Sequence, residues 1–151
     1  GDVPNVVARR GVDISPIDPS KASGQLRLLA YLWPDQPDRI ARTEAAISIA
    51  RDTPADVVAG DAGAWTEAAL ANPAADGLPV LYHTVAWQYF PDETRARALA
   101  AMESCPVPMV RLSMEADGGK GAALSLTHFP SGETEALGRV DFHGRWVLWS
   151  G

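Results

Sequence analysis

The stretch from Leu78 to Glu115 constrains the fold of this chain most, because it reads as a strand, a helix and a second strand. Residues 80–82 form a short apolar run entered through Pro79, a pattern typical of a strand buried on both faces. Residues 109–112 form the return strand. Such a unit indicates a parallel sheet with right-handed crossovers, in which residues 80–82 are the central strand.

The helix of this unit has its own start and face. Pro91 suits the first helical turn, where its missing N–H costs nothing, and Asp92 and Glu93 suit the positive end of the helix dipole. Opposite the charged residues, the helix carries a predicted inward stripe of small and apolar side chains: Ala96, Leu99, Ala100 and Met102.

The segments before and after this unit differ in character. Strands are expected within residues 6–14 and 55–61, and the helices expected between and after them cover three ranges: 25–32, 40–52 and 62–72. After Glu115 come short turns and alternating strands over residues 122–129 and 135–150. These turns are too short for parallel crossovers, so the sequence predicts parallel α/β structure first and an antiparallel tail last.

Length and composition suggest a single α/β domain over residues 1–151, since the chain is 46% hydrophobic and can bury a sizeable core. Its net charge is −6 with few, scattered cations, which argues against nucleic acid as a partner. No apolar run is long enough to cross a membrane, so no membrane association is expected. A lone cysteine, Cys105, fits a reducing, cytoplasmic location. The chain begins without methionine, which suggests a piece excised from a longer parent.

Two aspartates follow predicted parallel strands. Asp13 and Asp61 each lie near a strand's carboxyl end, where a carboxylate can accept hydrogen bonds from ribose hydroxyls or an adenine amino group. Aspartate also commonly caps the turn or helix that follows a strand. The pattern therefore allows a nucleotide-type site and a purely structural role.

A third polar position closes the central unit. His83, Thr84 and Glu115 lie at its polar end, where α/β sheets usually bind ligands. His83 could act as a general base, contact a ligand, or simply be satisfied by a neighbouring carbonyl. Trp87 lies just beyond the same strand, although tryptophans more often serve in packing.

Other motifs argue against specific chemistry. The spacing of the three histidines matches no metal site, so no metal is expected. The glycine-rich residues 118–121 lack the length and the Ser/Thr of a phosphate-binding loop and are expected to form a turn.

Several segments resemble known families. GVDISP at residues 11–16, VVAGDAGAW at 57–65 and the run from Leu81 to Met102 are similar to strand motifs of class I S-adenosylmethionine-dependent methyltransferases. More narrowly, RRGVDISPID, AYLWPDQPDRIAR, DAGAW and HGRWVLW resemble an uncharacterised bacterial family known as domain of unknown function 2332, over nearly the whole chain.

The resemblance implies a three-layer, Rossmann-like, mostly parallel sheet with an antiparallel carboxyl-terminal hairpin. It also implies S-adenosylmethionine as cofactor, with Asp13 on the ribose, Asp61 and Ala62 on the adenine and His83 beside the pocket. This chain departs from the pattern because no strand with a glycine-rich loop precedes Val6. The chain is therefore expected to be the carboxyl-terminal portion of its parent and inactive alone.

Two functions follow as hypotheses. One is a methyltransferase-like domain acting on an unknown small molecule. The other is a non-catalytic Rossmann-like domain for interaction, forming a homodimer through an exposed sheet edge. The residues do not decide whether the chain is an enzyme, and they assign no role to the segment Trp33–Arg39.

Overall fold

The computed structural model describes residues 4–74 and 77–150. By its internal contacts the chain divides into two compact units, residues 1–61 and residues 62–151, and each is described by itself. The expectation that the whole chain is one domain stays a prediction.

The first unit is built on a pair of parallel strands. Strand β1 (Arg10–Asp13) pairs with β2 (Asp56–Ala59) in a two-stranded sheet, and Asp13 is the register partner of Ala59. The N–H of Gly60 donates to the carbonyl of Asp13 at 3.0 Å, which extends the pairing beyond β2. Both predicted strands are confirmed, but they are shorter than expected and form a sheet of their own.

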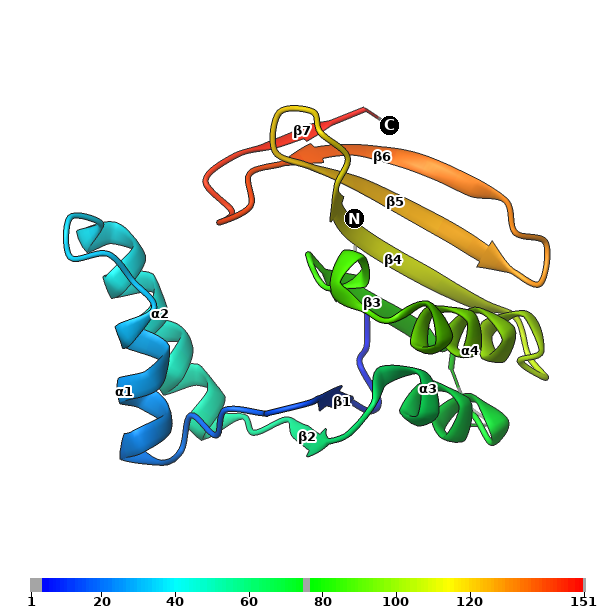
Figure 1. Cartoon of the computed structure of the whole chain (residues 1–151), viewed down its shortest axis with the longest axis horizontal. Coiled ribbons are helices and arrows are strands. Elements are labelled where there is room, and N and C mark those ends of the chain that lie inside the picture. Colours follow the sequence, from blue (N-terminus) through cyan, green and yellow to red (C-terminus); the bar gives the residue numbers. More distant parts are fainter. Residues whose placement is uncertain (1–3, 75–76, 151) are drawn as a thin grey trace. The chain divides into compact units, whose positions relative to one another are not determined.

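Two helices connect these strands. Helix α1 (Ala22–Ala30) and helix α2 (Pro37–Asp52) lie side by side in a hairpin (Figure 1). Pro37 occupies the first turn of α2, where a missing N–H is tolerated, and Gln36 is the N-cap. The segment Trp33–Arg39 is thus the turn between the helices together with the start of α2.

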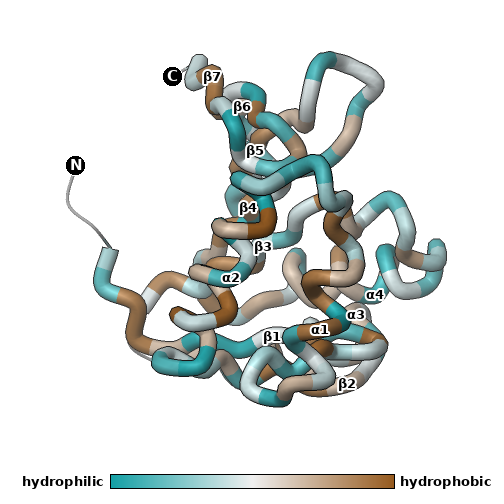
Figure 2. Tube along the Cα trace, turned by 90° about the vertical axis from the view of Figure 1, so that its left-hand side faces the viewer, coloured by the Kyte–Doolittle hydropathy of each residue, from teal (hydrophilic) through white to brown (hydrophobic). Residues whose placement is uncertain are grey.

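The second unit holds a five-stranded sheet in the order β3-β4-β5-β6-β7. The strands are β3 (Val80–Thr84), β4 (Met109–Ala116), β5 (Ala122–Phe129), β6 (Thr134–Val140) and β7 (Val147–Trp149). Within this sheet β3 and β4 are parallel, whereas the other three pairings are antiparallel. Figure 2 shows β7 as an apolar segment, in keeping with its sequence VLW.

The prediction of a mostly parallel Rossmann-like sheet is therefore wrong. The two parallel pairs belong to different sheets, and the larger sheet is mostly antiparallel because β4 and β5 pair along their whole length across a glycine-rich turn. The antiparallel tail itself is confirmed, with a turn at Asp141–Gly144 before β7.

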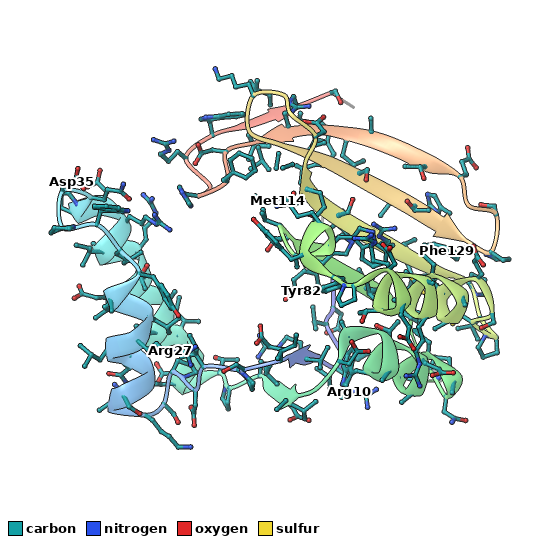
Figure 3. The ribbon with its side chains drawn as sticks, viewed as in Figure 1. Arg10, Arg27, Asp35, Tyr82, Met114 and Phe129 are labelled. Carbon is teal, nitrogen blue, oxygen red and sulfur yellow. The ribbon has the colours of Figure 1, made fainter. Side chains whose placement is uncertain are left out.

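Strand β3 is also not the central strand that the sequence indicated. It lies at the edge of its sheet, and its side chains alternate between exposed and half-buried. Tyr82, labelled in Figure 3, is 73% exposed. A run of three apolar residues cannot distinguish a strand buried on both faces from one buried on a single face, and here the second arrangement occurs.

The core of the second unit joins the sheet to two helices, α3 (Ala62–Ala71) and α4 (Asp92–Glu103), which pack against each other (Figure 1). Its buried members are Leu70, Ala98, Ala101, Met102, Met109 and Phe129. The helices approach closely, since a Cβ on Gly63 would lie 2.7 Å from the carbonyl oxygen of Thr94.

The buried face of α4 differs from the predicted one. Thr94, Ala98, Ala101 and Met102 are buried at helical spacing, whereas Ala96 and Ala100 are exposed. In an alanine-rich helix several faces are equally apolar, so the choice depends on what the helix packs against. The close approach of α3 selects the face that contains Thr94 and Ala98.

Candidate functional site

The carboxyl ends of the parallel strands β3 and β4 bring two predicted polar residues together. His83 pairs in register with Ser113, so Glu115 lies two residues further along β4 on the same face of the sheet. A short 3₁₀ helix, η1 (Trp87–Tyr89), follows β3 immediately. His83 and Glu115 are largely buried, with side chains 8% and 19% exposed respectively.

One carboxylate oxygen joins these elements. Glu115 Oε1 lies 2.6 Å from His83 Nδ1 and accepts the backbone N–H groups of Ala86 and Trp87 at 3.0 and 3.1 Å. Burial alone would raise the pKa of Glu115, but the hydrogen bonds from Trp87, Ala86 and His83 outweigh it and hold the pKa below its usual value. Glu115 is therefore an ionised carboxylate.

The hydrogen bonds also define the proton on His83. An ionised carboxylate can only accept, so Nδ1 of His83 carries the proton and donates to Glu115. Arg111 Nε, which is always a donor, lies 2.9 Å from His83 Nε2, so Nε2 is the acceptor. Burial, with the charge of Arg111, lowers the pKa of His83 despite the opposing effect of Glu115. His83 is thus a neutral imidazole whose two nitrogens are both occupied.

Trp87 completes the arrangement. Its ring stacks on the His83 ring with centroids 5.1 Å apart and planes inclined by 22°. The guanidinium carbon of Arg111 lies 4.2 Å from the Trp87 ring centroid, in cation–π geometry. We call His83, Trp87, Arg111 and Glu115 the Arg111 cluster.

Two polar groups of the cluster have hydrogen-bonding capacity that the described chain does not use. In the described chain, the terminal nitrogens of Arg111 make no hydrogen bond or ion pair, because the guanidinium is held through Nε and through the face of Trp87. Glu115 Oε2 is the buried side-chain atom without a hydrogen-bond partner among residues 4–74 and 77–150. Unsatisfied buried polar atoms are rare in folded proteins, so this oxygen calls for an explanation.

The other predicted site residues lie elsewhere along the chain. Asp13 ends β1, and its Oδ1 accepts the N–H of Ser15 at 2.7 Å, as in an ordinary turn. Asp61 follows β2 and Ala62 begins α3. Since Asp13 pairs with Ala59, the Cα atoms of the two aspartates can be no more than about 12 Å apart. Their predicted contacts with an adenosine group stay a prediction.

Comparison with known families shows which family the chain belongs to. A model of the family described as "Uncharacterized protein conserved in bacteria (DUF2332)" matches residues 1–149. The chain belongs to the DUF2332 family. No curated protein and no solved structure matches it. The predicted membership of this family is confirmed, whereas a methyltransferase-like fold is not supported, because the larger sheet of this DUF2332 chain is mostly antiparallel.

Three further findings concern potential metal ligands, the turn after β4 and membrane-spanning helices. No group of potential metal ligands occurs within the described part of this DUF2332 chain. Residues 118–121 join β4 to β5 as a turn, with positive φ at Gly118 and Gly121. No helix in the described ranges is both long and apolar enough to pass through a bilayer.

Sequence reasoning missed Arg111, the residue on which the cluster depends. It interrupts the apolar pattern MVRL of β4, and its register partner is Leu81, on the face that also carries His83. A charge inside an otherwise apolar strand was the available signal, since charged side chains are seldom buried without a partner.

Proposed function

We propose that this DUF2332 chain binds a small anionic molecule through Arg111. The observation that carries the proposal is the availability of the two terminal nitrogens of the guanidinium, which we call its fork. Arg111 is fixed by His83 and Trp87, while its terminal nitrogens have no partner in the described chain. Two parallel N–H groups on a planar guanidinium match the geometry of a carboxylate or phosphate group.

The cluster favours anion binding because it reduces the side-chain entropy that Arg111 loses when it binds a ligand. A free arginine loses rotamer entropy when it binds a ligand, whereas Arg111 is already held on the ring of Trp87 and bonded to His83. Arg111 is also partly desolvated, which lowers its pKa by burial, and partial burial strengthens an ion pair with a ligand. The overall charge of −6 repels anions, so affinity must come from this local arrangement.

The nearby negative charge sets a further requirement. Glu115 is neutralised in part by its three donors, but its second oxygen is buried and can accept one more hydrogen bond. This negative charge opposes an anion at Arg111, so the ion pair between the ligand and the guanidinium must outweigh that repulsion.

Calorimetric titration tests the proposal. Sulfate, acetate and lactate are titrated into the chain at pH 7.5, and into Arg111→Met and Arg42→Met. Arg42 lies on the exposed surface of α2, so its variant removes the same charge without touching the cluster. Saturable binding weakened at least tenfold in Arg111→Met alone supports the proposal. Equal binding by all three proteins, or by none, contradicts it.

Binding of an adenosine compound is a second candidate, favoured by one observation. Asp13 and Asp61 follow neighbouring parallel strands at the same edge of their sheet. S-adenosylmethionine and S-adenosylhomocysteine are the compounds to titrate first, with Asp13→Asn as the test variant and Asp38→Asn on exposed α2 as the control. Loss of binding in Asp13→Asn alone supports this role. No binding at millimolar ligand excludes it.

A further inference from the structure

We infer that the proton on His83 gates the anion site: Arg111 is oriented for its ligand only while His83 is neutral. This inference rests on the proposed anion-binding function. It follows from the order of donors and acceptors along the chain of hydrogen bonds from Glu115 through His83 to Arg111.

In the neutral state the chain is complete. His83 Nδ1–H donates to Glu115 at 2.6 Å, and the lone pair on Nε2 accepts the Nε–H of Arg111 at 2.9 Å. Protonation places a hydrogen on Nε2, where the lone pair was. Two N–H donors and two positive charges then face each other, so the bond that orients Arg111 cannot persist.

Arg111 is the partner that moves. His83 is anchored by Glu115, its ring stacks on Trp87, and its side chain is only 8% exposed. Among residues 4–74 and 77–150, the guanidinium of Arg111 is held only through Nε and by the ring of Trp87. Repulsion by the cationic imidazole therefore turns the guanidinium away from His83. The two terminal nitrogens of Arg111 then lose their fixed direction.

The pH range follows from the groups that act on His83. Its charged neighbours are Glu115 and Arg111, both on β4, and η1 contributes the ring of Trp87. Burial places the pKa of His83 below its ordinary value of 6.5, and Glu115 stays ionised in this range because its own pKa is also lowered. Anion affinity is thus constant near neutral pH and falls on acidification below about 6.5.

Charge alone predicts the opposite result, which makes the inference testable. A second cation near Arg111 would attract an anion more strongly, so affinity would rise as the pH falls. The geometry instead predicts a loss of affinity, because orientation of the fork outweighs the added charge.

The test uses sulfate, whose charge does not change between pH 4.5 and pH 8. Its Kd is measured by calorimetry across that range with the intact chain and with His83→Gln, whose side-chain amide can accept from Arg111 at every pH. The intact chain should lose about tenfold or more in affinity at the acidic end, while His83→Gln stays flat. Affinity that is constant or rises on acidification in the intact chain, or an equal fall in the variant, overturns the inference.

A second measurement needs no variant. Binding and protonation are linked, so saturating sulfate must lower the pKa of His83, read from its side-chain nitrogen resonances. An unchanged or raised pKa overturns the gate but leaves the anion site intact. Absence of sulfate binding at pH 7.5 overturns the site and the gate together.

Discussion

His83 and Glu115 are joined by a 2.6 Å hydrogen bond between Nδ1 and Oε1, although they lie 32 residues apart in the sequence. The bond ties the carboxyl end of the edge strand β3 to that of β4. Because Glu115 also accepts two N–H groups from the start of η1, one carboxylate fixes the turn, the imidazole and, through the imidazole, Arg111.

The first prediction concerns the tautomer of His83. We expect the Nδ1–H form at pH 7.5, which is the less common form of a free neutral histidine. Long-range proton–nitrogen correlation spectra distinguish the two nitrogens, and the exposed His128 serves as a reference in the same spectrum. A proton on Nε2 would contradict donation from Nδ1 to Glu115 and acceptance by Nε2 from Arg111.

The second prediction concerns the stability of the second unit. Glu115→Ala leaves three N–H donors near β4 without their acceptor and should lower the free energy of unfolding by about 3 kcal/mol. Glu115→Gln keeps an acceptor but loses the charge, so about 1 kcal/mol is expected. Urea denaturation measures both.

Glu103→Ala is the matched control for this series, since Glu103 is exposed at the end of α4. It should change the unfolding free energy by less than about 0.5 kcal/mol. An equally small effect of Glu115→Ala would show that the carboxylate does not organise the turn.

The third prediction compares two glycines with positive φ. A Cβ on Gly121 (φ +67) would lie 2.3 Å from the carbonyl oxygen of Val140 and 2.7 Å from the ring of Trp146, whereas a Cβ on Gly132 (φ +74) meets nothing within 4 Å. Gly132→Ala should cost about 1 kcal/mol for the left-handed backbone alone. Gly121→Ala should cost clearly more by thermal or urea unfolding, and equal losses would contradict the close packing.

The fourth prediction is the pH dependence of stability. Burial lowers the pKa of His83 in the folded chain, so between its unfolded value near 6.5 and that lower value the unfolded state binds more protons. The free energy of unfolding should therefore fall as the pH drops below about 6.5. His83→Gln should remove this part of the slope, and a chain whose stability is flat from pH 7 to pH 5 would disagree.

Much of the local structure could be predicted from the sequence. Proline, glycine and apolar periodicity locate the helices and strands, and the unit from Leu78 to Glu115 places His83 and Glu115 at the ends of two parallel strands, where they are found. One interpretation of His83 from the sequence is a residue satisfied by a neighbouring carbonyl. Its partner is a carboxylate rather than a carbonyl.

The sheet order could not be predicted, because it depends on contacts between residues distant in the sequence. The exposed Tyr82 and the buried face of α4 are set by which element lies opposite, and local propensity carries no such information. Arg111 was missed for the same reason: the sequence shows a charge in an apolar strand but not the imidazole and indole ring that receive it.

The central claim is that Arg111 is an anion receptor held in place by its neighbours, and its own Nε–H resonance tests this most directly. The resonance is followed by nitrogen-edited NMR during a sulfate titration at pH 7.5, with Arg111→Lys to assign the signal. The account predicts a single Arg111 signal, protected from exchange by His83, that shifts saturably while the Nε–H of exposed Arg42 does not. A signal for Arg111 that stays unmoved by sulfate, or that moves no more than that of Arg42, would contradict it.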